Sequence, residues 1–197
     1  AKPMLTFDAW QRCETVRTIL DWCLPESIAE ILDVGGYPGR MRQLLPKHNW
    51  VICDPLVDSP GEQVKGSALH LPFTDNSFDL SVSLDMLEHI APKDRVSVLD
   101  EMARVSREGF ILTFPYQSAA VEAAEKHVCE TYKTRFNKEH PWLSEHLQHP
   151  LPDVEEILKH LQTLGGQYVV LDVGTLSHWV ELQLTDQLLE SLPDGLD

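Results

Sequence analysis

The chain has 197 residues and a mass of 22.4 kDa, and 43% of its residues are hydrophobic and 24% charged, a composition typical of one globular domain. Its 16 Lys and Arg residues against 31 Asp and Glu residues give a formal net charge of −15. Nucleic acids are bound largely through Lys and Arg that displace condensed counterions. The charge therefore argues against a DNA or RNA partner and favours small molecules or proteins.

Two further exclusions concern membranes and metals. No apolar run approaches the roughly 20 residues that a membrane-spanning helix needs, and the first residues, "AKPMLTFDAWQRCE", lack the apolar core of a signal peptide. The four cysteines form no Cys-x-x-Cys pair. We therefore expect a reducing, cytoplasmic setting, no membrane partner and no structural zinc bound by these cysteines.

The spacing of apolar residues predicts strands that alternate with helices. In chain order we expect a helix at 8–23, a strand at 28–34, a short helix at 41–45, strands at 49–54 and 78–84, a helix at 92–105, a strand at 109–114, a helix at 152–166, and two last strands at 167–173 and 177–184. Alternation implies right-handed crossovers, hence an α/β fold whose mostly parallel sheet has helices on both faces. The short turn "GTL" between the last strands predicts an antiparallel C-terminal edge pair.

A glycine-rich turn, Asp33–Gly39, follows the first predicted strand in the stretch "EILDVGGYPGR". In an open parallel sheet, the first strand-to-helix turn is the usual cofactor loop, where glycine allows close backbone approach. The dinucleotide pattern Gly-x-Gly-x-x-Gly would need glycine at positions 35, 37 and 40, but the chain has Tyr37 and Arg40 at the last two. A nicotinamide or flavin cofactor is therefore disfavoured.

An acidic residue, Asp54, ends the next predicted strand. A carboxylate at this place can accept hydrogen bonds from both ribose hydroxyls of an adenosine ligand. The alternative is that Asp54 only forms a turn, as aspartate often does at strand ends. The glycine turn and Asp54 together favour a cofactor site.

The chain resembles the class I S-adenosylmethionine-dependent methyltransferases, in particular the group similar to ubiquinone and menaquinone biosynthesis methyltransferases (type 11). The matching segments are "ILDVGGYPGR", "CD", "GSALHLPFTDNSFDLSVSLDMLEHI" and "LDEMARVSREGFILTFPY", within about residues 28–116. The resemblance implies a Rossmann-like fold with a seven-stranded sheet, S-adenosylmethionine as cofactor, and in-line transfer of its sulfonium methyl group to a substrate nucleophile.

The resemblance also implies a set of cofactor-binding residues. In the turn that begins at Asp33, the residues that match the loop beside the methionine moiety are Gly35, Gly36, Tyr37 and Gly39. The other matches are Asp54 for the ribose, Ser67, Ala68 and Leu69 beside the adenine, and Ser83 and Leu84 near the amino group of the donor. The family usually has glycine at the place of Tyr37 and often aspartate at the place of Ser67. A non-catalytic binding domain of the same fold therefore stays an alternative.

Catalytic candidates come from the segment 116–152, which we predict to be a substrate lid, because long connections in compact domains often cover an active site. His140 and His146 are candidate bases near neutral pH, and Tyr116 follows a strand end. The alternative is that the segment is a surface helix docked on the core. We expect one domain over residues 1–197.

The segment "SLDMLEH" carries Asp85, Glu88 and His89, a pattern similar to the metal-binding Glu-x-x-Glu-His of some quinone and small-RNA 2′-O-methyltransferases. His140, His146 or His149 from the lid could complete such a group, but the alternative, a capped and solvated turn, leads us to predict no metal. The segment lacks the Asn/Asp-Pro-Pro-aromatic motif of enzymes that methylate nucleic acid bases. We predict a small-molecule O-methyltransferase; the alternatives are a binding scaffold and a metal-assisted RNA 2′-O-methyltransferase.

Overall fold

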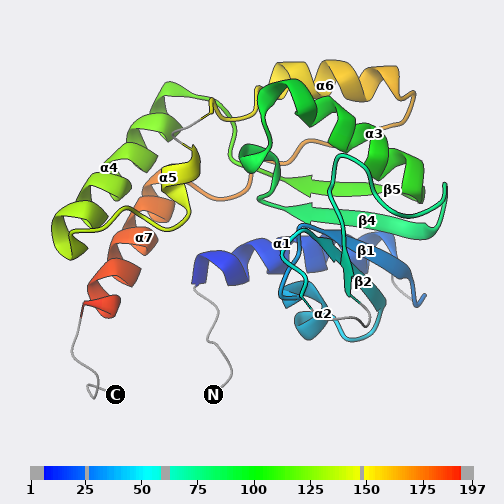
Figure 1. Cartoon of the computed structure of the whole chain (residues 1–197), viewed down its shortest axis with the longest axis horizontal. Helices are drawn as coiled ribbons and strands as arrows, with labels where there is room; N and C mark the ends of the chain where they lie inside the picture. The colour runs from blue at the N-terminus through cyan, green and yellow to red at the C-terminus, as the bar shows by residue number, and fades with distance from the viewer. Residues whose placement is uncertain (1–6, 25–26, 59–62, 147–148, 192–197) are drawn as a thin grey trace.

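The computed structural model of the chain describes residues 7–24, 27–58, 63–146 and 149–191 (Figure 1). The bounds of its helices and strands are α1 Phe7–Cys23, β1 Glu30–Val34, α2 Arg40–Leu44, β2 Asn49–Asp54, β3 Gln63–Lys65, β4 Phe78–Leu84, the 3-10 turns η1 Leu87–His89 and η2 Pro92–Asp94, α3 Arg95–Val105, β5 Ser106–Thr113, α4 Ala119–Phe136, α5 Leu143–His146, α6 Val154–Thr163 and α7 Leu176–Glu190. Helices lie between β1 and β2 and between β4 and β5, whereas β2, β3 and β4 follow one another along the chain without a described helix between them.

The sheet has five strands in the order β3-β2-β1-β4-β5, and all neighbouring pairs are parallel. Its two faces are covered by helices, α1 and α2 on one side and α3 and α6 on the other (Figure 1). The alternation along β1 explains this, since Ile31 packs with residues of α1 and α2 while Leu32 and Val34 pack with residues of α3. The α/β fold with a parallel sheet is confirmed.

A third group of helices, α4, α5 and α7, lies beyond the carboxyl ends of β4 and β5 (Figure 1). Its small core contains Val128, Cys129 and Leu143, against which Trp179 and Val180 of α7 pack. Within the predicted lid, 116–152, the chain therefore forms α4 and α5 rather than an irregular segment. This helical group faces the edge of the sheet where cofactor loops of α/β proteins lie.

The predicted strand at 177–184 is wrong, because these residues belong to α7. The sequence "SHWVELQL" satisfies a two-residue alternation, but in the structure Trp179 and Val180 lie on a helix and both pack against the small core formed by α4 and α5. The side chain of Gln187 further fixes α7 by donating a hydrogen bond to the Val128 carbonyl at 3.1 Å. Without this strand, the predicted antiparallel edge pair does not form.

The predicted strand at 167–173 is also not formed, since the segment has no regular secondary structure and Val169 is 84% exposed. The sheet of the described residues therefore has five strands rather than seven, with β5 at one edge. At the other edge lies the short strand β3, which the apolar pattern did not predict. Among the described helices, none combines the length and apolar character needed to cross a membrane.

Candidate cofactor-binding and catalytic site

The loop after β1 requires glycine at two consecutive positions. Gly35 has a φ of +74°, and a Cβ added there would lie 2.7 Å from Cγ of Met86. A Cβ added at Gly36 would lie 2.0 Å from Cγ of Asp33, well inside van der Waals contact. The Gly35 amide donates a hydrogen bond to the Cys53 carbonyl at 2.8 Å, which fixes the loop against β2. Only glycine lets the backbone turn this tightly over the strand ends.

Two carboxylates lie at the ends of β1 and β2. Asp33 is 2% exposed, and burial, followed by the nearby Asp54 charge, raises the pKa of Asp33 from 3.8 to about 7. Asp54 is also buried; its Oδ2 accepts a hydrogen bond from the Tyr37 amide at 3.3 Å, and its Oδ1 accepts one from the Leu56 amide at 2.7 Å. Each oxygen of a carboxylate has a second lone pair, so Asp54 can still accept hydrogen bonds from a ligand.

The other predicted cofactor residues also follow the carboxyl ends of parallel strands. Ser67 follows β3, and its Oγ accepts a hydrogen bond from the Leu69 amide at 3.2 Å. The Ser83 hydroxyl is buried and donates to the Val34 carbonyl at 2.9 Å, which ties β4 to β1. The Tyr37 side chain is 42% exposed, so its ring reaches toward solvent rather than filling the loop. The predicted cofactor residues therefore lie along the same edge of the sheet.

The three catalytic candidates have different surroundings. His140 is buried, and its Nδ1 accepts hydrogen bonds from the amides of Trp142 at 3.4 Å and Leu143 at 3.2 Å, which caps α5. Burial lowers the pKa of His140, which favours the neutral ring that such an acceptor requires. Tyr116 is 41% exposed, just beyond β5.

His146 is buried at the end of α5, where it contacts acidic residues from two other elements. Its Nδ1 lies 3.0 Å from Oε1 of Glu125, and its Nε2 lies 3.9 Å from Oε1 of Glu88. The rings of His146 and His89 meet edge to face, with centroids 4.9 Å apart. Burial raises the pKa of Glu88 to about 8 and lowers that of His89. A residue of the predicted lid segment thus contacts the turn η1 beside the predicted cofactor loop.

Asp85 does not share in this contact. Its Oδ2 pairs with the guanidinium of Arg12 on α1, and its Oδ1 accepts a hydrogen bond from the Thr113 hydroxyl at 3.2 Å. The backbone of Asp85 has a φ of 47°, which turns the chain sharply after β4. The structure therefore separates the three residues of this sequence pattern: Asp85 pairs with Arg12, whereas Glu88 and His89 lie beside His146.

Comparison with known proteins shows what the central segment is similar to. Residues 32–114 match the sequence profile of a family described as "Methyltransferase domain". Over these residues the chain is similar to this methyltransferase family. A relative from Mycobacterium sp. (strain JLS), named an uncharacterized methyltransferase, is 30% identical over 97 residues, which cover 44% of this chain and 38% of the relative. The match is therefore confined to less than half of either protein.

Two solved structures, one of them a methyltransferase, share the fold beyond the matched segment. An S-adenosylmethionine-dependent methyltransferase from Thermotoga maritima superposes with a TM-score of 0.56 at 16% identity, over 81% of this chain and 71% of that chain. The YcgJ protein from Bacillus subtilis gives a TM-score of 0.58 at 15% identity, over 90% and 81% of the two chains. At these identities the similarity establishes the fold alone. The methyltransferase fold thus extends over most of this chain.

The sequence did not predict the roles of two residues outside the matched segment, Arg12 and Glu125. Arg12 lies on α1, and Glu125 is 4% exposed on α4, where it holds His146. A charged residue on an amphipathic helix is usually solvated, so the sequence gives no signal that either side chain turns inward. Only the docking of the helices around the strand ends brings these charges to the site.

Proposed function

We propose that the chain is an S-adenosylmethionine-dependent methyltransferase that methylates an oxygen of a small-molecule acceptor. The observation that carries the proposal is the loop at Gly35 and Gly36, packed over the buried Asp33 and beside Asp54 at the strand ends. The methyltransferase profile over residues 32–114 and the S-adenosylmethionine-dependent enzyme of the same fold support this choice of cofactor.

The cofactor would lie across the carboxyl ends of β1, β2 and β4. Asp54 would accept hydrogen bonds from the ribose hydroxyls with the lone pairs that the Tyr37 and Leu56 amides leave free. The glycine loop would let the methionine part approach the backbone. Ser67, Ala68 and Leu69 would border the adenine, with Ser83 and Leu84 near the amino group.

The reaction that we propose is a direct displacement. The acceptor oxygen attacks the methyl carbon, a C–O bond forms as the C–S bond breaks, and the sulfur keeps the electron pair, which leaves S-adenosylhomocysteine. The acceptor proton passes to a base, for which His146 and Tyr116 are the candidates at the strand ends. Holding the two reactants close and in line supplies most of the acceleration.

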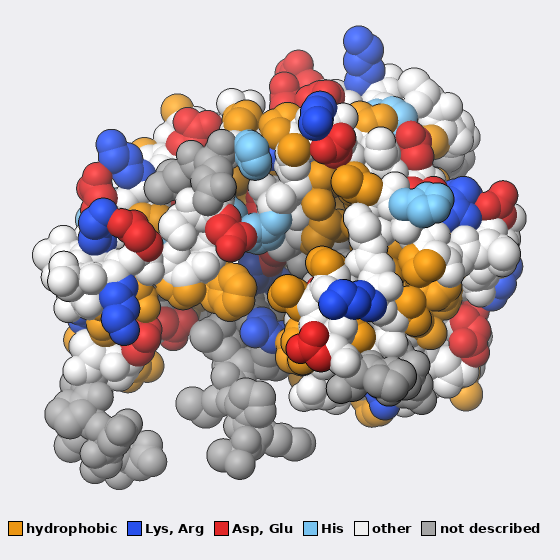
Figure 2. Space-filling model, in the orientation of Figure 1, with side chains coloured by type: hydrophobic (Ala, Val, Ile, Leu, Met, Phe, Trp, Pro, Cys, Tyr) orange, Lys and Arg blue, Asp and Glu red, His pale blue; other side chains and the backbone are white. Residues whose placement is uncertain are grey.

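A small acceptor fits the charge of the protein better than a nucleic acid does. The net charge is −15, and on the face drawn in Figure 2 the Lys and Arg side chains are interspersed with Asp and Glu. A polyanion requires clustered cations. The helices α4 and α5, which lie beyond the strand ends, would cover the acceptor, and we propose that the sheet and this helical group act as one domain.

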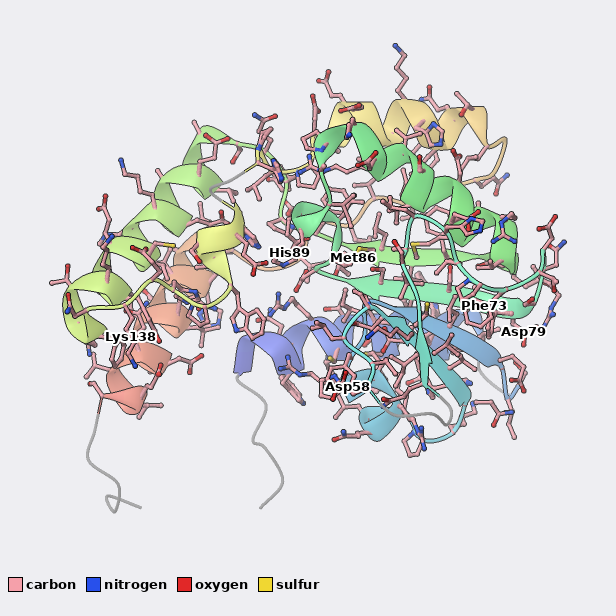
Figure 3. The ribbon with its side chains drawn as sticks, viewed as in Figure 1. Asp58, Phe73, Asp79, Met86, His89 and Lys138 are labelled. Atoms are coloured by element: carbon pink, nitrogen blue, oxygen red, sulfur yellow. The ribbon has the colours of Figure 1, made fainter. Side chains whose placement is uncertain are left out.

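Cofactor binding is tested by isothermal titration of S-adenosylhomocysteine into the protein, with NAD as the control ligand. We expect saturable binding with S-adenosylhomocysteine alone, weakened about tenfold or more by Asp54→Asn through loss of a charged acceptor. The matched control is Asp79→Asn, because Asp79 lies at the opposite, amino end of β4 (Figure 3) and accepts a hydrogen bond from the Glu30 amide. No binding to the wild type at millimolar ligand would instead favour a non-catalytic scaffold.

A further inference from the structure

The group formed by Glu88, His89 and His146, the inner cluster, has the composition of a metal site. One ligand atom from each residue lies within 4.8 Å of the other two. Glu88 and His89 come from the turn η1, whereas His146 comes from α5, far along the chain. Figure 3 shows His89 beside Met86, between the end of β4 and α5. Two imidazoles and one carboxylate are a ligand set that first-row transition metals accept.

Glu88 is buried, but one of its carboxylate oxygens is not paired within the part of the chain that the structure describes. It is 2% exposed, and among the described residues its Oε2 has no hydrogen-bond partner. Its Oε1 is 3.9 Å from Nε2 of His146, too far for a hydrogen bond. The nearby Arg95 donates hydrogen bonds to the carbonyls of Ile90 at 3.1 Å and Pro150 at 2.6 Å. A buried carboxylate oxygen without a partner is costly, and coordination to a cation is one of the few arrangements that offset that cost.

Both histidines are held as metal-binding histidines usually are. Nδ1 of His146 lies 3.0 Å from Oε1 of Glu125, and Nδ1 of His89 lies 3.0 Å from Oε2 of Glu145. An Nδ1–H that donates to a carboxylate leaves the lone pair on Nε2, and the carboxylate makes that nitrogen a better ligand. Glu125 is itself buried, so it fixes the ring of His146. If η1 were only a capped or solvated turn, it would not need two histidines, each paired with a glutamate, next to the buried carboxylate of Glu88.

We propose that Glu88, His89 and His146 bind a divalent transition-metal ion, with zinc as the probe of choice. Zinc lies about 2.0–2.2 Å from nitrogen and oxygen ligands, so its ligand atoms are about 3.4 Å apart. Small side-chain rotations would close the present spacing. Three protein ligands leave a fourth coordination position open. Magnesium is disfavoured because it requires oxygen ligands in a near-ideal octahedron. None of these ligands comes from the glycine loop, so the inference does not rest on the proposed function.

Such an ion would have two consequences for the molecule. It would join α5 to η1 and so fasten the helical group to the sheet, next to Met86, which packs against Gly35. It would also occupy the Nε2 lone pair of His146, which then could not serve as a general base; Tyr116 would remain the candidate. Because the ion binds only the folded chain at this site, it should raise the melting temperature.

The test is titration of zinc into chelator-treated full chain, followed by calorimetry and thermal melting. We expect one ion per chain, a melting temperature several degrees higher at saturating zinc, and affinity lowered about tenfold or more by Glu88→Gln and by His89→Ala. His89 is partly exposed, so this variant tests the site with little loss of packing. The control is His160→Ala, because His160 pairs with Asp100 on the surface without a third ligand.

Cobalt in place of zinc identifies the ligands by absorption. A spectrum typical of nitrogen and oxygen ligands, lost in Glu88→Gln, supports the site. Thiolate charge-transfer bands would assign the ion to a cysteine such as the exposed Cys23 and overturn the proposal. Absence of stoichiometric binding to the wild type, or equal affinity in the wild type, Glu88→Gln and His89→Ala with native circular dichroism, would also overturn it.

Discussion

Replacing Asp33 with asparagine should make the protein more stable at alkaline pH, because the buried carboxyl group resists ionisation. Its pKa is raised from 3.8 to about 7, chiefly by burial and then by Asp54. An acid whose pKa is higher in the folded state binds more protons when folded, so stability falls as pH rises between the two values. At about 1.4 kcal/mol per pH unit the whole loss is about 4 kcal/mol.

Between pH 5 and pH 8 we expect about 3 kcal/mol of this loss. The other part occurs below pH 5, where Asp33 already ionises in the unfolded chain but not in the folded one. Relaxation around the charge would reduce this value, so it is an upper estimate. Asp33→Asn removes the ionisation, whereas the other titrating groups remain in both proteins and largely cancel in the difference. The variant should therefore gain free energy of unfolding relative to the wild type as pH rises from 5 to 8.

The assay is urea unfolding at pH 5 and pH 8, followed by tryptophan fluorescence, for the wild type and Asp33→Asn. Asp58→Asn, which changes an exposed aspartate (Figure 3), is the control and should show no such gain. If Asp33→Asn differs from the wild type by the same free energy at both pH values, Asp33 titrates normally and the reasoning from burial is wrong.

Three further substitutions test the glycine loop, the predicted lid segment and the contact of α3 with the loop between β3 and β4. Gly36→Ala should abolish S-adenosylhomocysteine binding in calorimetry, since its Cβ would meet the Asp33 carboxylate, whereas Gly166→Ala, which has open space, should bind normally. His140→Ala removes the acceptor for the amides of Trp142 and Leu143 at the start of α5 and should cost about 1 kcal/mol of unfolding free energy in urea. An unchanged midpoint would contradict the capping role. Arg104→Met removes hydrogen bonds to the Leu71 and Phe73 carbonyls and should lower the free energy of unfolding by about 2 kcal/mol in the same assay. Wild-type stability of this variant would contradict the expectation.

The predictions that succeeded rest on local sequence patterns that fit only one type of local structure. The apolar runs at 49–54 and 78–84 became β2 and β4 with the predicted bounds, because a buried strand between polar turns needs no particular partner to be recognised. The glycine turn was placed correctly because glycine is the residue that close approach to Asp33 and Met86 permits. In a parallel sheet, residues at the strand ends must then share one edge, which brings Asp54 and Ser83 near that turn.

The failures occurred where two structures satisfy the same local pattern. Residues 177–184 fit a strand and a helix equally well, and the choice was decided by the apolar face of α4, which the sequence does not place in space. β3 is short and carries too few apolar residues to be detected.

The sequence by itself determined the order of the central elements, the glycine turn and the resemblance to methyltransferases, because these depend on residues close together in the chain. Tertiary structure alone decided that His146 and Glu125 meet Glu88 beyond the strand ends while Asp85 pairs with Arg12 instead. Such contacts depend on how α1, α4 and α5 dock around the sheet, and buried charges are selected by that packing rather than by any local period.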